Sequence, residues 1–135
     1  MTLVIDASAL VAILGERDQD GRWATAAVAG EQLAAPHIVL AEASNSLRRL
    51  ERVGYLSAGA ANRAHRELAE SSVSVFSFRP FAERIWELRN NLSSYDAWYV
   101  ALAEALDCPL LTLDLRMSRS PGPACTFLTP PGEDV

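Results

Sequence analysis

The chain has 135 residues, of which 50% are hydrophobic, 21% are charged and 7% are aromatic. This is enough sequence for one domain with a buried core, and the composition excludes a disordered chain, a collagen-like repeat and a disulfide-stapled miniprotein. The net charge is -5 and all 12 basic residues are arginine, a bias that we attribute to genome composition rather than to mechanism.

Short segments of alternating type run along the whole chain. In chain order they predict a strand (3–5), a helix (6–15), a helix (20–29), a strand (33–35), a helix (37–53), a helix (57–71), a strand (73–78), a helix (80–89), a helix (93–106), a strand (109–113), a short helix or turn (116–120) and a strand (126–128). Gly15 and Gly30 are predicted helix stops, Ser57 is a predicted N-cap, and Ser93 or Ser94 is another.

This alternation of strands and helices predicts an α/β fold. We expect a three-layer α/β/α sandwich around a mainly parallel sheet of about five strands, built from right-handed βαβ units. Residues 1–128 are expected to form one domain, and residues 129–135 a flexible C-terminal tail. Ligands of such folds bind at the carboxyl ends of the strands, where the strand order reverses.

Four acidic residues occupy positions at or near these strand ends. Asp6 follows the first strand, Asp114 follows the strand 109–113, and Asp96 lies in the first turn of the helix before that strand. Glu42 lies in the first half of the helix 37–53, away from its apolar stripe. Each acid also has a structural explanation, because three of them can cap helices and Glu42 can be a solvated surface residue.

Together, the four carboxylates favour a metal site. Crowded carboxylates resist ionisation unless a cation neutralises them. A set of oxygen ligands without His or Cys suits Mg²⁺ or Mn²⁺ rather than Zn²⁺, and we interpret His37 and His65 as ordinary residues. Such a site cleaves phosphodiesters with metal-activated water, which fits a chain without a Ser-His-Asp or Cys-His arrangement.

Four segments resemble the acidic motifs of PIN-domain nucleases, above all the VapC toxins of bacterial and archaeal VapBC toxin–antitoxin pairs. They are Val-Ile-Asp-Ala-Ser-Ala-Leu (4–10), Pro-His-Ile-Val-Leu-Ala-Glu-Ala-Ser-Asn-Ser-Leu (36–47), Tyr-Asp-Ala-Trp-Tyr-Val-Ala-Leu-Ala-Glu (95–104) and Pro-Leu-Leu-Thr-Leu-Asp (109–114). The resemblance spans residues 3 to about 128, with the four motifs in family order. It implies a PIN-like nuclease domain over residues 1–128.

The resemblance also implies a role for each acid. Asp6, Glu42, Asp96 and Asp114 would form a catalytic quartet that binds Mg²⁺ or Mn²⁺. Asp6 and Asp96 would be direct ligands, while Glu42 and Asp114 would ligate, position water or complete the second shell. Some PIN domains carry a further acid after the fourth, where this chain has Leu115. One bound ion and two bound ions therefore both stay open.

Three polar residues match positions near the site in the same family. Ser8 matches the small residue after the first acid, Asn45 a polar neighbour of the helical Glu, and Thr112 a hydroxyl next to the fourth acid. Thr112 is equally well explained as a β-forming residue in a strand.

The resemblance implies an Mg²⁺-dependent endoribonuclease that is the toxin of a type II pair. Its expected partners are a tRNA, rRNA or mRNA substrate, a VapB-like antitoxin and a second copy of the chain in a homodimer. The antitoxin's C-terminal segment would occupy the acidic groove, often with an arginine directed at the carboxylates.

Net charge does not exclude RNA binding. The four site carboxylates account for four of the five net negative charges, and a bound cation would offset them. Arg48, Arg49, Arg116 and Arg119 are candidate phosphate contacts, since guanidinium groups bind phosphate in a bidentate manner. The first two are equally well explained as part of a solvated helix face.

The remaining features predict a cytoplasmic protein. Segment 32–41 is among the longest uncharged runs and falls short of the roughly 18 residues of a membrane span, and the first residues do not resemble a signal peptide. Cys108 and Cys125 are expected to be buried free thiols. Trp23, Trp86 and Trp98 are expected to anchor the core or an interface.

Three alternatives compete with a toxin. The first is a PIN nuclease for RNA maturation or turnover that has no antitoxin. The second is a catalytically silent PIN-like binding module, which the presence of all four acids disfavours. The third is a Mg²⁺-dependent phosphatase or phosphotransferase, which usually needs a second Asp where this chain has Ser8.

Overall fold

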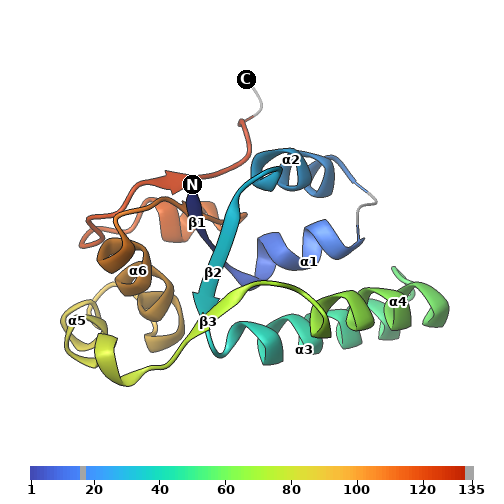
Figure 1. Cartoon of the computed structure of the whole chain (residues 1–135), viewed down its shortest axis with the longest axis horizontal. Helices are drawn as coiled ribbons and strands as arrows, with labels where there is room; N and C mark the ends of the chain where they lie inside the picture. The colour runs from blue at the N-terminus through green and yellow to red at the C-terminus, as the bar shows by residue number, and fades with distance from the viewer. Residues whose placement is uncertain (16–17, 133–135) are drawn as a thin grey trace.

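The computed structural model describes residues 1–15 and 18–132, so the predicted tail is described only as far as residue 132. The elements are β1 (Thr2–Ile5), α1 (Ala7–Gly15), α2 (Gln19–Val28), β2 (Gln32–Pro36), α3 (Val39–Arg52), α4 (Ala58–Ala69), β3 (Ser74–Phe76), the 3₁₀ turn η1 (Arg79–Phe81), α5 (Ala82–Glu87), α6 (Ser94–Leu106), β4 (Leu110–Leu111), α7 (Leu115–Ser118) and β5 (Phe127–Leu128). They form a sheet with helices on both sides, which confirms the predicted α/β/α sandwich (Figure 1).

All five strands are parallel and lie in the order β3-β2-β1-β4-β5, with β1 in the centre. The chain adds β2 and β3 on one side of β1 and then returns to add β4 and β5 on the other. The strand order therefore reverses between β1 and β4, and the carboxyl ends of these two strands mark the switch point of the sheet.

The helices divide between the two faces because parallel crossovers are right-handed. In Figure 1, α1 to α4 lie on one side of the sheet, and α5 and α6 lie on the other. Helix α6 packs against β1 and β2 and is buried on most of its surface. Its buried residues include Ala97, Ala101 and Ala103, whose small side chains allow close packing.

Several boundaries differ from the prediction for local reasons. The predicted strand 73–78 shortens to three residues because Phe78 already has helical dihedrals before η1. The predicted helix 80–89 divides into η1 and α5. The ladder of β4 ends at Leu111, although the Thr112 amide still donates to the Leu128 carbonyl at 3.0 Å.

The three tryptophans do not share one environment. Trp23 and Trp98 pack partly buried against the core, and Trp98 meets Phe78 edge to face at 5.4 Å between ring centroids. Trp86 is 65% exposed, with the Arg89 guanidinium 4.5 Å from its ring centroid, so it is not a core residue. Within the described residues, no helix is long and apolar enough to span a membrane.

Candidate active site

Asp6 lies directly after β1, at the switch point of the sheet, and only 7% of its surface is exposed. One carboxylate oxygen, Oδ1, accepts hydrogen bonds from the Ser8 hydroxyl at 2.7 Å and the Ala9 amide at 3.0 Å. The other, Oδ2, accepts a hydrogen bond from the Thr112 hydroxyl. Burial raises the pKa of Asp6 above its usual range, although these three donors oppose the shift.

Two hydroxyl groups tie the end of β1 to the end of β4. Thr112 is fully buried, and its Oγ1 donates to Asp6 and accepts from the Asp114 amide at 2.9 Å. The Ser8 Oγ donates to Asp6 and accepts from the Leu113 amide at 3.2 Å. The structure therefore places both predicted hydroxyls against Asp6, and Thr112 does more than fill a strand position.

Glu42 reaches the same region from the first turn of α3. Its Oε1 accepts a hydrogen bond of 2.6 Å from the hydroxyl of Tyr99, which belongs to α6. Tyr99 is only 2% exposed. Burial, together with the nearby Glu42 carboxylate, raises the pKa of Tyr99 far above its usual value, so the phenol stays protonated and donates.

Tyr99 is the site residue that sequence reasoning missed. It lies three residues after Asp96, and helical residues three apart share a face. The spacing of three residues from Asp96 is the sequence feature that could have pointed to Tyr99. The contact with Glu42 spans 57 residues of sequence, however, and no local pattern reveals that a side chain of α6 meets one of α3.

Asp96 and Asp114 occupy helix N-termini, as their structural explanations predict. The Asp96 amide donates to Oγ of the N-cap Ser93 at 3.1 Å, and Asp114 Oδ1 accepts from the Met117 amide at 3.1 Å as the N-cap of α7. Burial is the main cause that raises the pKa of Asp96, and the charge of Asp114 adds to it. The positive charge of Arg116 lowers the pKa of Asp96, which shows that Arg116 lies near this carboxyl group.

Charge interactions connect the four acids. Asp96 raises the pKa of Asp6, Asp96 and Asp6 both raise the pKa of Glu42, and Asp114 raises that of Asp96, each after the larger effect of burial. The structure thus gathers residues from β1, α3, α6 and the β4–α7 loop. In the parts of the chain that it describes, no three His, Cys, Asp or Glu side chains already form a group that could hold a metal ion.

The donor chemistry nevertheless fits a hard divalent cation. The carboxyl groups of Asp6, Glu42 and Asp96 have raised pKa values and so resist ionisation. A neighbouring positive charge would lower these pKa values and favour the ionised form. The oxygen-only set suits Mg²⁺ or Mn²⁺. Within the described residues these carboxylates affect the ionisation of Asp6, Glu42 and Asp96 without forming a coordination shell.

These raised pKa values predict a pH dependence for the metal-free protein. Each of the three carboxyl groups holds its proton more tightly when folded, so its contribution to stability is complete below its unfolded pKa of about 4 and disappears as the pH rises through the folded value. In EDTA, the Tm of the wild type is expected to fall relative to that of Asp96→Asn as the pH rises above about 4. A Tm difference that is independent of pH would contradict the coupling.

The predicted RNA contacts occupy two places. Arg116 lies in α7 and lines a pocket of about 240 Å³ with Asp96, Ser93 and Asn91. Arg119, the C-cap of α7, is exposed. The other predicted residues, Asn45, Arg48 and Arg49, are all exposed on α3 after Glu42.

Known proteins resemble this chain in sequence and in fold. The PIN domain family model matches residues 3–122. Ribonuclease VapC9 of Mycobacterium tuberculosis is 43% identical over 129 residues, which cover 96% of this chain and 98% of the relative. The crystal structure of PAE2754 from Pyrobaculum aerophilum has a TM-score of 0.63 and 27% identity, covering 87% of this chain and 83% of that one.

A third likeness concerns the fold alone. The structure of VapBC2 from Rickettsia felis, bound to a DNA fragment from their promoter, has a TM-score of 0.67 at 15% identity, covering 96% of this chain and 98% of that one. Since the family model matches most of the sequence and a VapC relative matches nearly all of it, this chain belongs to the PIN-domain family of VapC ribonucleases.

Proposed function

We propose that the chain is a metal-dependent endoribonuclease and the toxin of a VapBC-type pair, with residues 1–128 as its nuclease domain. The observation that carries this proposal is that four acids lie near the switch point of the sheet, where burial and neighbouring carboxylates raise the pKa of Asp6, Glu42 and Asp96. The relatives named VapC ribonucleases support RNA as the substrate.

In this proposal Asp6, Glu42, Asp96 and Asp114 are the catalytic residues and hold Mg²⁺ or Mn²⁺. Asp6 and Asp96 ligate directly, while Glu42 and Asp114 ligate directly or through water. When bound, such a cation lowers the pKa of a water ligand and balances charge on the phosphate.

Hydrogen bonds from neighbouring side chains fix the orientation of two of the four carboxylates. Ser8 and Thr112 fix both oxygens of Asp6, and Tyr99 fixes one oxygen of Glu42. The proposed phosphate contacts are Arg116, whose charge acts on Asp96, and the exposed residues Arg48, Arg49 and Arg119. Asn45 lies one helical turn beyond Glu42 and is an accessory polar contact.

The proposed macromolecular partners are an RNA, a VapB-like antitoxin and a second copy of this chain. A complex named VapBC2 shares the fold, which supports a toxin–antitoxin pairing. Cellular RNA as substrate favours a cytoplasmic location.

The decisive experiment is RNA cleavage by the purified full-length protein, free of antitoxin. Total cellular RNA is incubated with Mg²⁺, with Mn²⁺ or with EDTA, and Asp6→Asn is run in parallel. We expect discrete fragments that require metal and disappear in the variant. Metal-dependent fragments of the same sequence and yield from the wild type and the variant would show that Asp6 takes no part in cleavage, and would contradict the proposed mechanism.

Removing the Tyr99 hydroxyl tests its positioning role. Tyr99→Phe deletes the donor that stabilises the Glu42 carboxylate, so the pKa of Glu42 rises further. We expect cleavage to fall by about 10- to 100-fold at neutral pH, and the acidic limb of the pH–rate profile to move to higher pH. Tyr95→Phe, at an exposed position of the same helix, is the control. An unchanged pH profile would leave Tyr99 with a packing role only.

A further inference from the structure

Two cysteines precede neighbouring strands, each by two residues. Leu110 of β4 pairs with Phe127 of β5, and the Leu110 amide donates to the Thr126 carbonyl at 2.9 Å. Continued two residues back, beyond the first residue of each strand, this parallel register would bring Cys108 opposite Cys125. Adjacent strands lie about 4.8 Å apart, and disulfide-linked Cα atoms lie roughly 4.4–6.8 Å apart. The backbone register therefore suits a bridge.

The two cysteines also share a cavity. The charge of Cys108 acts on Cys125, so the two thiols lie near each other. Both cysteines are free and partly exposed, and both line one pocket of about 350 Å³. A small solute can thus reach both thiols from solvent.

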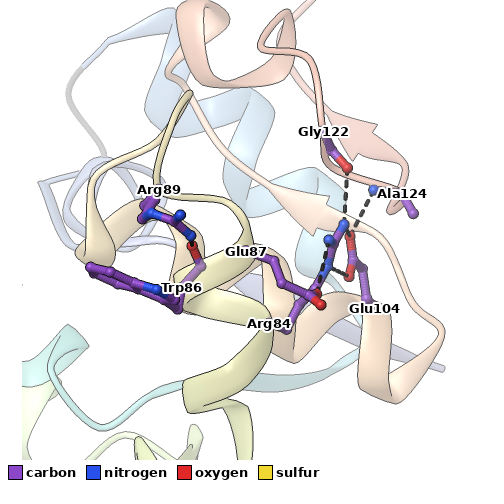
Figure 2. Close-up of polar contacts among 7 residues, drawn as sticks. All are labelled: Arg84, Trp86, Glu87, Arg89, Glu104, Gly122 and Ala124. Atoms are coloured by element: carbon purple, nitrogen blue, oxygen red, sulfur yellow. Dashed lines mark hydrogen bonds and ion pairs between the residues drawn. The ribbon is translucent and has the colours of Figure 1, made fainter.

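Surrounding contacts hold both cysteines in place. Arg84 donates through Nε and Nη2 to the two carboxylate oxygens of Glu104, at 2.7 and 3.1 Å, and through Nη2 to the Gly122 carbonyl at 2.9 Å (Figure 2). The Ala124 amide donates to Glu104 at 2.7 Å. This network fastens the segment before Cys125 to α6.

The other cysteine is fixed by the end of α6. The Cys108 amide donates to the Ala103 carbonyl at 3.1 Å, directly after Asp107, which has a left-handed φ of 50°. Hydrogen bonds to α6 thus hold the backbone at or next to each cysteine.

We propose that Cys108 and Cys125 form a reversible intramolecular disulfide whose oxidant is a low-molecular-weight disulfide. One thiolate attacks the oxidant, forms a mixed disulfide and releases one small thiolate. The second cysteine thiolate then attacks the protein sulfur and releases the other. In total, two protein thiols are oxidised to one bridge, and one small disulfide is reduced to two thiols.

Two observations argue that this cysteine pair is neither a metal site nor a fast-reacting redox centre. Among the described residues, no third His, Cys, Asp or Glu joins the thiols in a metal-binding group. Burial raises the pKa of both cysteines, that of Cys125 to about 11 with a contribution from the Glu104 charge. Thiolates are therefore scarce at neutral pH, and the bridge forms slowly as a stabilising bond.

The disulfide would close a loop of the chain that contains part of the proposed nuclease site, although neither cysteine belongs to that site. The closed loop runs from Cys108 to Cys125 and contains Thr112, Asp114 and Arg116. Closing a loop of this length restricts the unfolded chain, and the expected gain in Tm is about 10 °C. The proposal does not depend on the nuclease assignment, because its evidence comes from β4, β5 and α6.

The test equilibrates the native full-length protein with mixtures of oxidised and reduced glutathione, followed by acid quenching and intact mass measurement. The wild type is expected to lose the mass of two hydrogen atoms as a monomer and to regain it in excess reduced glutathione. Cys108→Ser and Cys125→Ser are expected to carry one glutathionyl group instead. Glutathionyl adducts on both wild-type cysteines, or an intermolecular dimer, would overturn the proposal.

Thermal unfolding tests whether the native fold accepts the bridge. Oxidised wild type is expected to unfold about 10 °C above reduced wild type, whereas each serine variant shows no such rise under the same treatment. A bridge that lowers the Tm of the wild type would show that the sulfur atoms meet only in a distorted or unfolded chain, and would also overturn the proposal.

Discussion

Replacing Asp96 with asparagine is expected to reduce RNA cleavage by about 1000-fold, because a metal ligand contributes several kcal/mol of transition-state stabilisation. The same change should not destabilise the metal-free protein. Burial and the charge of Asp114 make the ionised form of Asp96 unfavourable, and a neutral amide removes that cost. The Ser93 cap remains, because it binds the Asp96 backbone amide.

The contrast between lost activity and retained stability is what distinguishes a metal ligand from a structural residue. Cleavage rates with Mg²⁺ and Tm values in EDTA are measured for wild type, Asp96→Asn and Asp20→Asn. Asp20 is an exposed acid in the first turn of α2 and serves as the matched control. If Asp96→Asn cleaves RNA at the wild-type rate, Asp96 only begins a helix and the metal proposal is wrong.

Helix caps and functional residues coincide in this site. Asp6 accepts from the Ala9 amide, and Asp114 accepts from the Met117 amide. The structural explanations predicted from sequence are therefore correct for both residues, and they are compatible with the proposed catalytic role. A carboxylate that caps a helix has one oxygen held in a fixed direction, which also orients the group toward a shared centre.

Local sequence signals predicted most of the fold because the elements carry their own boundaries. Gly15 is the last residue of α1, and Ser57 and Ser93 cap α4 and α6 as expected. The apolar segment 3–5 forms a strand as predicted, and it is the central one of the sheet. These signals depend on residues within a few positions of one another, so a single sequence contains them.

Contacts between distant segments were not predictable in the same way. The register that pairs Leu110 with Phe127, and so aligns the two cysteines, depends on how β5 docks against β4. Trp86 is exposed because of the way α5 is oriented on the domain. That orientation cannot be inferred from the apolar character of the tryptophan side chain. The sequence indicated which acids lie near the switch point of the sheet, but not that Tyr99 contacts one of them.

Thr112 provides the second large effect, because it connects two site acids through one buried hydroxyl. It donates to Asp6 and accepts from the Asp114 amide. Thr112→Val keeps the shape but deletes both hydrogen bonds. We expect unfolding to become easier by about 2 kcal/mol, because a buried carboxylate and a backbone amide each lose a partner. We also expect cleavage to fall by about 10- to 100-fold as Asp6 loses its orientation.

Thr112→Ser and Thr126→Val separate these contributions. Serine retains the hydroxyl, so it should restore cleavage to within a few-fold of wild type even if the lost methyl group lowers the Tm. Thr126→Val makes the same chemical change at an exposed position just before β5, and both cleavage and Tm should stay near the wild-type values. If Thr112→Val cleaves RNA as fast as Thr112→Ser, the hydroxyl serves the strand and not the site, and Asp6 needs no positioning from β4.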